Sequence, residues 1–132
     1  MKKHYRGVEI TALWAEKAEN DLLNAEHTLK MESNCPFDTI CFHSQQCAEK
    51  YIKALLIFHS IDFPKTHDLA ELVELFPENL EIGVDVDDLS ILNSYSVSVR
   101  YPGFEEPLTR RDATKALSIA KKIRNAIKGL LK

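Results

Sequence analysis

The sequence predicts an all-α protein, an up-and-down helical bundle of about five helices, from two observations. Apolar residues recur every three or four positions along most of the chain, which is the spacing of one helix face. No segment alternates with a period of two for more than a few residues, and no Asn-Gly or Asp-Gly pair separates two apolar runs, as a β-hairpin would require. The 132 residues fit one domain, 1–132.

The first helix is predicted at about 11–30, and its apolar stripe consists of Leu13, Trp14, Ala18, Leu22, Ala25 and Leu29. Pro36 lies in the connection that follows, and proline is best placed in the first turn of a helix because it lacks an N–H. A second helix is therefore predicted at about 37–59. Its core side holds Ile40, Ser44, Cys47, Tyr51, Leu55 and Phe58, and the opposite side holds Gln45, Glu49 and Lys53.

A short third helix is predicted between an N-cap at Thr66 and a stop at Pro77. The fourth helix is expected within 86–99, although Val97 and Val99 also permit a short strand there. Segment 100–109 contains two prolines and a glycine, so we expect an ordered loop. The last helix follows and runs to the end of the chain, with Thr109 as N-cap and Asp112 three residues later as a variant capping box.

Composition excludes several classes of protein. The apolar fraction of 45% and the charged fraction of 28% are typical of a globular domain and do not indicate disorder or a fibrous repeat. We expect a cytoplasmic protein, since no apolar run approaches the length of a membrane helix and the start lacks a signal-peptide pattern. The three cysteines stand six residues apart, which predicts buried free thiols rather than disulfides.

The histidines and glycines exclude further chemistry. None of the five histidines is spaced three or four residues from another, so no metal site is predicted. The four glycines are too scattered for a phosphate-binding loop or a dinucleotide fingerprint, and no cofactor is expected.

Charge is distributed unevenly although the net charge is only −3. Residues 68–108 hold ten acids and Arg100 as the sole base, whereas 109–132 hold eight bases and Asp112 as the sole acid. The basic segment either offers a surface to an anionic partner or attracts the acidic segment within the fold. On the last helix, a basic stripe is predicted on the solvent side at Lys121, Arg124, Lys128 and Lys132.

Polar residues on the second helix give the first candidate site. Glu49 and Lys53 are spaced for an ion pair that contributes about 0.3–0.5 kcal/mol when exposed. The surface around them is also polar, with His43, Gln45, Gln46 and Lys50. Such a surface could instead accept a negatively charged or hydrogen-bonding ligand.

Two positions outside that helix are further candidates. Arg100, with Tyr101 beside it, needs a carboxylate or a phosphate as partner, because it is alone in an acidic segment. His67 follows the predicted N-cap Thr66, where it is either a surface cap residue or part of a phosphate-binding corner with Lys65.

Three blocks of sequence, in order, carry a family resemblance: "FHSQQCAEKYIKALLIFHSIDFPKTHDL", "LSILNSYSVSVRYPGFEE" and "DATKALSIAKKIRNAIKGLL". With these blocks the chain, over about 11–131, resembles the HEPN domain family, small helical proteins named for nucleotide binding in higher eukaryotes and prokaryotes. The resemblance implies a bundle of about five helices that forms a homodimer and is often paired with a minimal nucleotidyltransferase.

Many members of that family are RNases or toxins with an Arg followed by a His after four to six residues. Here the corresponding positions after Arg100 hold Glu105, Glu106 and Pro107, and no other Arg has a correctly spaced His. A carboxylate does not replace imidazole as a base at neutral pH without a large pKa shift. We therefore carry over no catalytic residue, and we lean toward a protein that is not an enzyme.

The resemblance places Glu49, Lys53, His67, Arg100 and Tyr101 in one ligand-binding cluster, with Glu49 and Arg100 as the expected ion pair. The leading hypothesis is a non-catalytic accessory or toxin-antitoxin-like protein that binds a nucleotide-like anion, RNA, or a nucleotidyltransferase partner. The alternatives are a divergent metal-independent RNase that uses His67 or His43 with Arg100, and a dimeric scaffold without a ligand.

Overall fold

The computed structural model of the chain describes residues 2–96 and 106–131. It contains five helices in that part of the chain: α1 (Lys2–Leu29), α2 (Phe37–Phe58), α3 (Leu69–Val73), α4 (Val86–Asn93) and α5 (Arg110–Leu130). No strand occurs in the described residues, and the prediction of an all-α helical bundle is confirmed.

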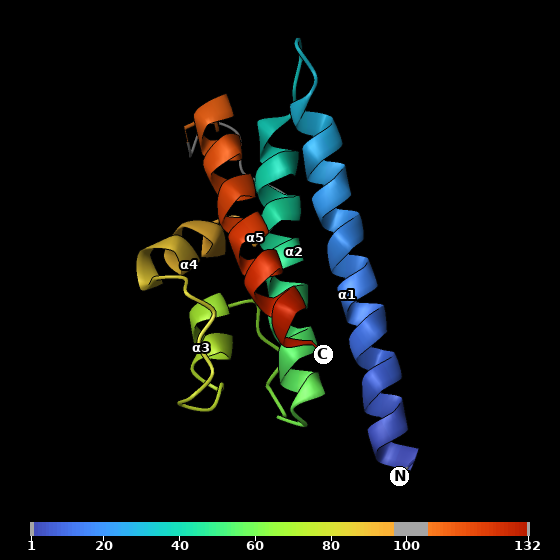
Figure 1. Cartoon of the computed structure of the whole chain (residues 1–132). Coiled ribbons are helices and arrows are strands. Elements are labelled where there is room, and N and C mark those ends of the chain that lie inside the picture. The colour runs from blue at the N-terminus through green and yellow to red at the C-terminus, as the bar shows by residue number, and fades with distance from the viewer. Residues whose placement is uncertain (1, 97–105, 132) are drawn as a thin grey trace.

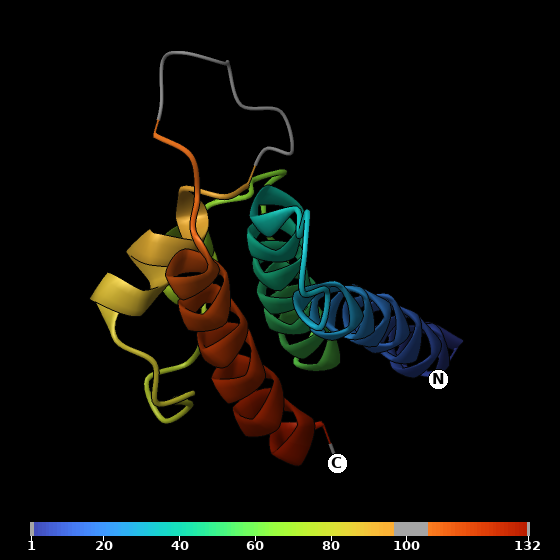
Figure 2. The same cartoon turned by 90° about the horizontal axis from the view of Figure 1, so that it is seen from above.

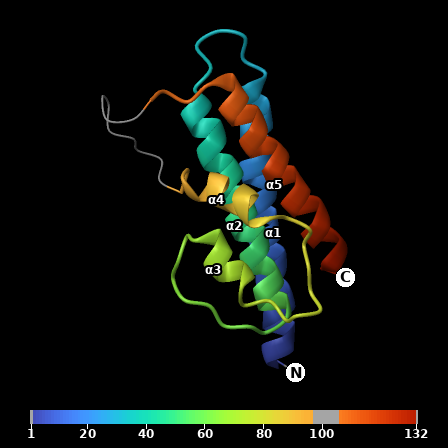
Figure 3. The same cartoon turned by 90° about the vertical axis from the view of Figure 1, so that its left-hand side faces the viewer.

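Three long helices form the body of the molecule, and α2 lies between α1 and α5 (Figures 1 and 2). Helix α1 is antiparallel to α2, because a short connection joins them at one end (Figure 1). The short helices α3 and α4 pack on the side of α2 and α5 that faces away from α1 (Figure 2). The chain returns through α3 and α4, so α5 runs in the same direction as α2 (Figure 3).

The helix starts follow the capping chemistry of the sequence, with one correction. Thr109 and Asp112 form the predicted capping box at the start of α5, each side chain bonded to the other residue's backbone N–H. The predicted N-cap Thr66 is wrong: Asp68 caps α3, and its carboxylate accepts hydrogen bonds from two backbone N–H groups. Thr66 lies just outside the helix, where its hydroxyl accepts from the Asp68 N–H at 3.1 Å.

Two predicted boundaries also changed. Helix α1 begins at Lys2, well before the predicted start near residue 11, and α4 ends at Asn93. Val97 and Val99, for which a strand was considered, lie outside the described residues.

The core is built around α2, whose residues Ile40, Cys47, Tyr51 and Leu55 are at most 1% exposed. Ala18, Leu22 and Ala25 of α1 pack against it as the sequence predicted. Leu13 does not, because its side chain is 58% exposed. Phe58, also predicted to be in the core, is only partly buried.

Ion pairs connect the basic α5 to acidic residues of other helices. Lys115 and Lys122 lie 3.9 and 4.0 Å from the carboxylate of Asp88 in α4. Lys121 lies 3.6 Å from Glu26 in α1. The two pairs with Asp88 support the interpretation that the acidic and basic segments attract each other within the fold.

Among the described residues, no helix is long and apolar enough to cross a membrane.

Candidate functional site

The candidate site lies on α2 and contains buried polar residues. Gln45, Glu49 and Lys53 are 0, 4 and 7% exposed, although the sequence placed them on the side of α2 opposite the core. With Gln46 and His67 they form a connected group, which we call the Glu49 cluster. A buried charged pair must be well paired to be tolerated, so this is not an ordinary solvated helix face.

Glu49 is the centre of this cluster. Its Oε2 accepts from Lys53 Nζ at 3.1 Å. Its Oε1 accepts from Gln45 Nε2 at 3.1 Å and pairs with Nδ1 of His67 at 2.9 Å. Gln46 Nε2 donates to Gln45 Oε1 at 2.8 Å, which extends the network along the helix. One carboxylate therefore orients a lysine, a histidine and Gln45, and Gln45 in turn holds Gln46.

His67 is the exposed member of the cluster, with a side chain that is 67% accessible. An ionised carboxylate only accepts hydrogen bonds, so the Nδ1–H of His67 must donate to Glu49. This tautomer leaves Nε2 for a ligand, as an acceptor in neutral imidazole or as a donor in imidazolium. Gln45 also donates to the backbone carbonyl of His67 at 3.3 Å, which fixes the loop before α3.

Two aromatic rings flank the buried lysine. The Lys53 ammonium lies 5.7 Å from the ring centre of Trp14 in α1 and 5.6 Å from that of Phe63 in the loop after α2. Both distances are within the range of cation–π attraction. Both rings are only partly buried. The site therefore consists of the Glu49–Lys53 ion pair with two partly exposed aromatic rings beside it.

The proposed phosphate-binding corner at the start of α3 is not supported. The N–H groups of Ala70 and Glu71 already donate to the Asp68 carboxylate. The Leu69 N–H donates to Asn93 Oδ1 at 2.8 Å. His67 precedes these donors and turns toward Glu49 instead, so its role is in the Glu49 cluster.

Arg100 and Tyr101, predicted as ligand-binding residues, lie outside the described residues. The predicted ion pair between Glu49 and Arg100 stays a prediction. Within the described residues, Glu49 is paired with Lys53.

A second cluster joins α1 to α2 beside the first. Asp21, 8% exposed, pairs through Oδ1 with Nδ1 of His43 at 2.7 Å and accepts from Lys50 Nζ through Oδ2 at 2.6 Å. We call these three residues the Asp21 cluster. Its bonding repeats that of the Glu49 cluster, where a carboxylate also holds one histidine by Nδ1 and one lysine.

A third network lies between α1 and α5. Arg124 donates to both oxygens of Glu19 at 3.0 and 2.9 Å, and the hydroxyl of Tyr51 donates to Glu19 Oε2 at 2.6 Å. The hydrogen bond from Arg124 lowers the pKa of Glu19. Burial raises the pKa of Tyr51. Arg124 is 28% exposed and paired with Glu19, so an acid of α1 neutralises its charge within the predicted basic stripe.

This network predicts a pH effect on stability. The folded pKa of Glu19 lies below its ordinary value of 4.5, so the carboxylate stabilises the fold above that pH and loses this contribution as pH falls through the folded pKa. Solvent screens the partly exposed pair, so we expect on the order of 1 kcal/mol or less. The difference in urea midpoint between wild type and Glu19→Gln should shrink from pH 7 to pH 3. Glu16→Gln, an exposed control on the same helix, should match wild type; a constant Glu19 difference would contradict the prediction.

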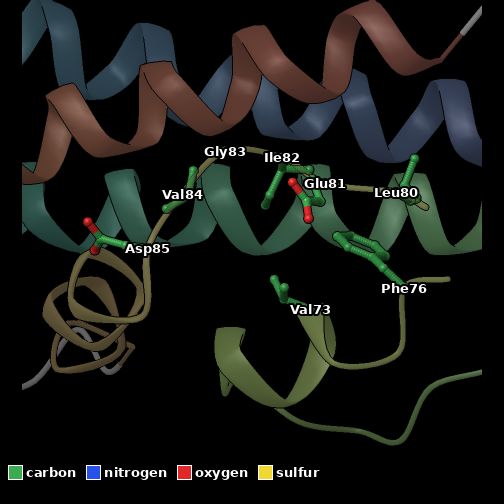
Figure 4. Close-up of a pocket in the computed structure, with 8 residues that line it drawn as sticks. All are labelled: Val73, Phe76, Leu80, Glu81, Ile82, Gly83, Val84 and Asp85. Atoms are coloured by element: carbon green, nitrogen blue, oxygen red, sulfur yellow. The ribbon is translucent and has the colours of Figure 1, made fainter. Parts of the chain in front are cut away.

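Among the described residues, two cavities lie outside the Glu49 and Asp21 clusters. One, of about 430 Å³, opens between the end of α3 and segment 80–85 (Figure 4). It is lined by Val73, Phe76, Leu80, Glu81, Ile82, Gly83, Val84 and Asp85. The other, of about 270 Å³, lies between α1 and α5, where the basic side chains of Lys121 and Arg124 are paired with acids. Neither cavity contains a residue of the Glu49 cluster.

Cys41 and Cys47 are buried and Cys35 is partly buried, and these three thiols form no disulfide. Burial raises the pKa of Cys47, which favours the unreactive thiol. In the described residues, no three His, Cys, Asp or Glu side chains are grouped to hold a metal ion.

Sequence reasoning missed Trp14 and Phe63 beside the Glu49 cluster, and it missed Asp21 as the centre of the second cluster. Asp21 had a readable signal, because it interrupts the buried stripe between Ala18 and Leu22. An acid at such a position needs a partner on the facing helix. Trp14 was assigned to the core, and Phe63 lies in a loop where periodicity gives no information.

Comparisons with known proteins agree with this architecture. The model of the HEPN domain family matches residues 11–130. Among solved structures, TT1696 from Thermus thermophilus is 26% identical with a TM-score of 0.75, over 90% of this chain and 96% of that one. ST0689, described as an archaeal HEPN homologue, is 29% identical with a TM-score of 0.66, over 92% of this chain and 98% of that one. No curated protein gives a significant match.

Proposed function

The chain belongs to the HEPN domain family, as its three sequence blocks indicated, and from this premise we propose a non-catalytic accessory protein that binds a nucleotide-like anion. The observation that carries the proposal is the exposed imidazole of His67, held by the buried carboxylate of Glu49. A side chain fixed in one tautomer and one orientation is prepared to meet a ligand.

The surroundings of His67 favour a nucleotide over a simple ion. Trp14 and Phe63 lie at the border of the cluster through their contacts with Lys53, and aromatic side chains stack on nucleobases. Lys53 itself is neutralised by Glu49 and is nearly buried, so it contributes position more than net charge. The exposed Lys65, two residues before His67, supplies positive charge on the same loop. We keep Arg100, predicted from the sequence as a ligand-binding residue, as a second cation in this proposal.

The absence of catalysis rests on the sequence. The positions where the family's RNases carry a histidine after arginine hold Glu105, Glu106 and Pro107. From family membership we propose a cytoplasmic homodimer that pairs with a minimal nucleotidyltransferase in a toxin-antitoxin-like system. RNase activity and a ligand-free scaffold remain the competing functions.

Thermal unfolding with a panel of nucleotides, with and without Mg²⁺, tests the binding proposal. A ligand at one hundred times its Kd stabilises a fold by about 2.7 kcal/mol, and this gain should be lost in His67→Ala. His27→Ala is the matched control, because His27 is exposed on α1. Unchanged stability with every nucleotide would refute nucleotide binding, and RNA cleavage abolished by His67→Ala or His43→Ala would favour the RNase.

A further inference from the structure

The Asp21 cluster is built like a site but is not part of the proposed one. Asp21 is nearly buried, whereas the side chains of His43 and Lys50 are 23 and 25% exposed. Both carboxylate oxygens are engaged, one by each partner. The partly exposed side chains of His43 and Lys50 are therefore held in place by a nearly buried carboxylate.

The bonding fixes what each partner can offer. An ionised Asp21 only accepts, so the Nδ1–H of His43 donates to it and Nε2 is left for other partners. The ammonium of Lys50 has three N–H groups, and one donates to Asp21. With the imidazole protonated, the three groups carry a net charge of +1. Two cationic donors oriented by one carboxylate suit a phosphate oxygen.

The two clusters are neighbours on one surface. His43, Gln46, Lys50 and Lys53 follow one another along α2 at steps of three, four and three, which is a single helix stripe. On α1, Trp14 and Asp21 are seven residues apart, or two turns and about 10 Å along the same side. Trp14 lies near Lys53, and Asp21 pairs with Lys50. The Glu49 cluster and the Asp21 cluster therefore lie one after the other along the two antiparallel helices α1 and α2.

We propose that the Asp21 cluster is a phosphate subsite for the ligand whose base lies at the Glu49 cluster. The inference rests on the proposed function. It restricts the ligand to a nucleotide whose phosphate groups extend from the nucleoside at the Glu49 cluster as far as the Asp21 cluster. A nucleoside triphosphate and a short single-stranded oligonucleotide share this chemistry. Lys50 Nζ donates to the phosphate oxygens, and His43 Nε2 joins it as a donor in the imidazolium form, while Asp21 holds both side chains.

Calorimetric titration of the full chain tests the subsite with adenosine, adenosine triphosphate and a tetranucleotide. Lys50→Gln should weaken binding of the phosphate-bearing ligands at least tenfold and change adenosine binding less than twofold. The ligand that wild type binds with the lower Kd, adenosine triphosphate or the tetranucleotide, shows whether the phosphate belongs to a nucleoside triphosphate or to an oligonucleotide. Lys17→Gln, an exposed lysine on α1, is the control and should match wild type. Equal affinities for adenosine triphosphate in wild type and Lys50→Gln would overturn the subsite.

A second measurement keeps the two proposals separable. The imidazole signal of His43 is followed by NMR during addition of inorganic phosphate alone, in wild type and in Lys50→Gln. A shift that needs Lys50 supports the subsite, and no shift in wild type overturns it. If adenosine, adenosine triphosphate and tetranucleotide all fail to bind wild type, the nucleotide-binding function fails, whatever His43 shows. Thermal unfolding of each variant establishes that the fold is retained.

Discussion

Replacing Glu49 by glutamine is expected to lower the free energy of unfolding by about 3–5 kcal/mol, because it leaves the ammonium of Lys53 buried without an anionic partner. Lys53 is 7% exposed, so water does not compensate for the lost carboxylate. The glutamine has nearly the same shape and keeps one acceptor oxygen, whereas its NH2 group faces a donor that the carboxylate had accepted from. Urea unfolding at pH 7 measures the difference.

The double variant Glu49→Gln with Lys53→Met is the informative companion. Removing both charges and keeping the length of the lysine stem should recover most of the stability, since a buried ion pair is often no better than an apolar pair of similar volume. Glu26→Gln is the matched control, because its pair with Lys121 is 37 and 47% exposed and should change stability by less than about 1 kcal/mol. A loss in Glu49→Gln no larger than in Glu26→Gln would contradict the prediction.

Glu49 both stabilises the fold and orients His67, so a loss of ligand binding in Glu49→Gln has two possible causes. His67 is 67% exposed, and its replacement removes the ligand-facing group at small cost to the fold. His67→Ala is therefore the variant that reports on binding.

Local chemistry in the sequence was sufficient to predict most of the fold. The apolar stripes located α2 and α5, and the capping box of Thr109 and Asp112 fixed the start of α5. The cap of α3 was misplaced because Thr66 and Asp68 are both good N-cap residues two positions apart. Leu13 was misassigned because a stripe of hydrophobic residues gives a helix face but not its breadth.

The candidate site was harder to predict, because burial depends on neighbours that are distant in sequence. Glu49 and Lys53 face away from the α2 residues that pack in the core, and an exposed pair would show the same spacing. Trp14 of α1 and Phe63 of the loop after α2 lie beside the Lys53 ammonium, and His67 of the loop before α3 contacts Glu49. The pairing of Asp21 with His43 and Lys50 likewise requires the register of α1 on α2, which periodicity alone does not give.

Leu55→Ala is expected to lower the free energy of unfolding by about 2–5 kcal/mol, a loss similar to that of Glu49→Gln but with a different cause. Leu55 is fully buried in α2, the helix between α1 and α5, so truncation opens a cavity in the centre of the bundle (Figure 2). Two long helices bound that space, and rigid neighbours limit how far a core can collapse around a cavity. Urea unfolding measures the loss.

Leu23→Ala is the control, since Leu23 is 53% exposed on α1 and should change stability by about 0.5 kcal/mol or less. Equal losses at the two leucines would mean that α2 is not the centre of the core. Because α2 also carries Glu49 and Lys53, loosening the bundle should weaken ligand binding as well. Leu55→Ala should therefore lose nucleotide affinity in proportion to its unfolded fraction, whereas His67→Ala should lose affinity while remaining folded.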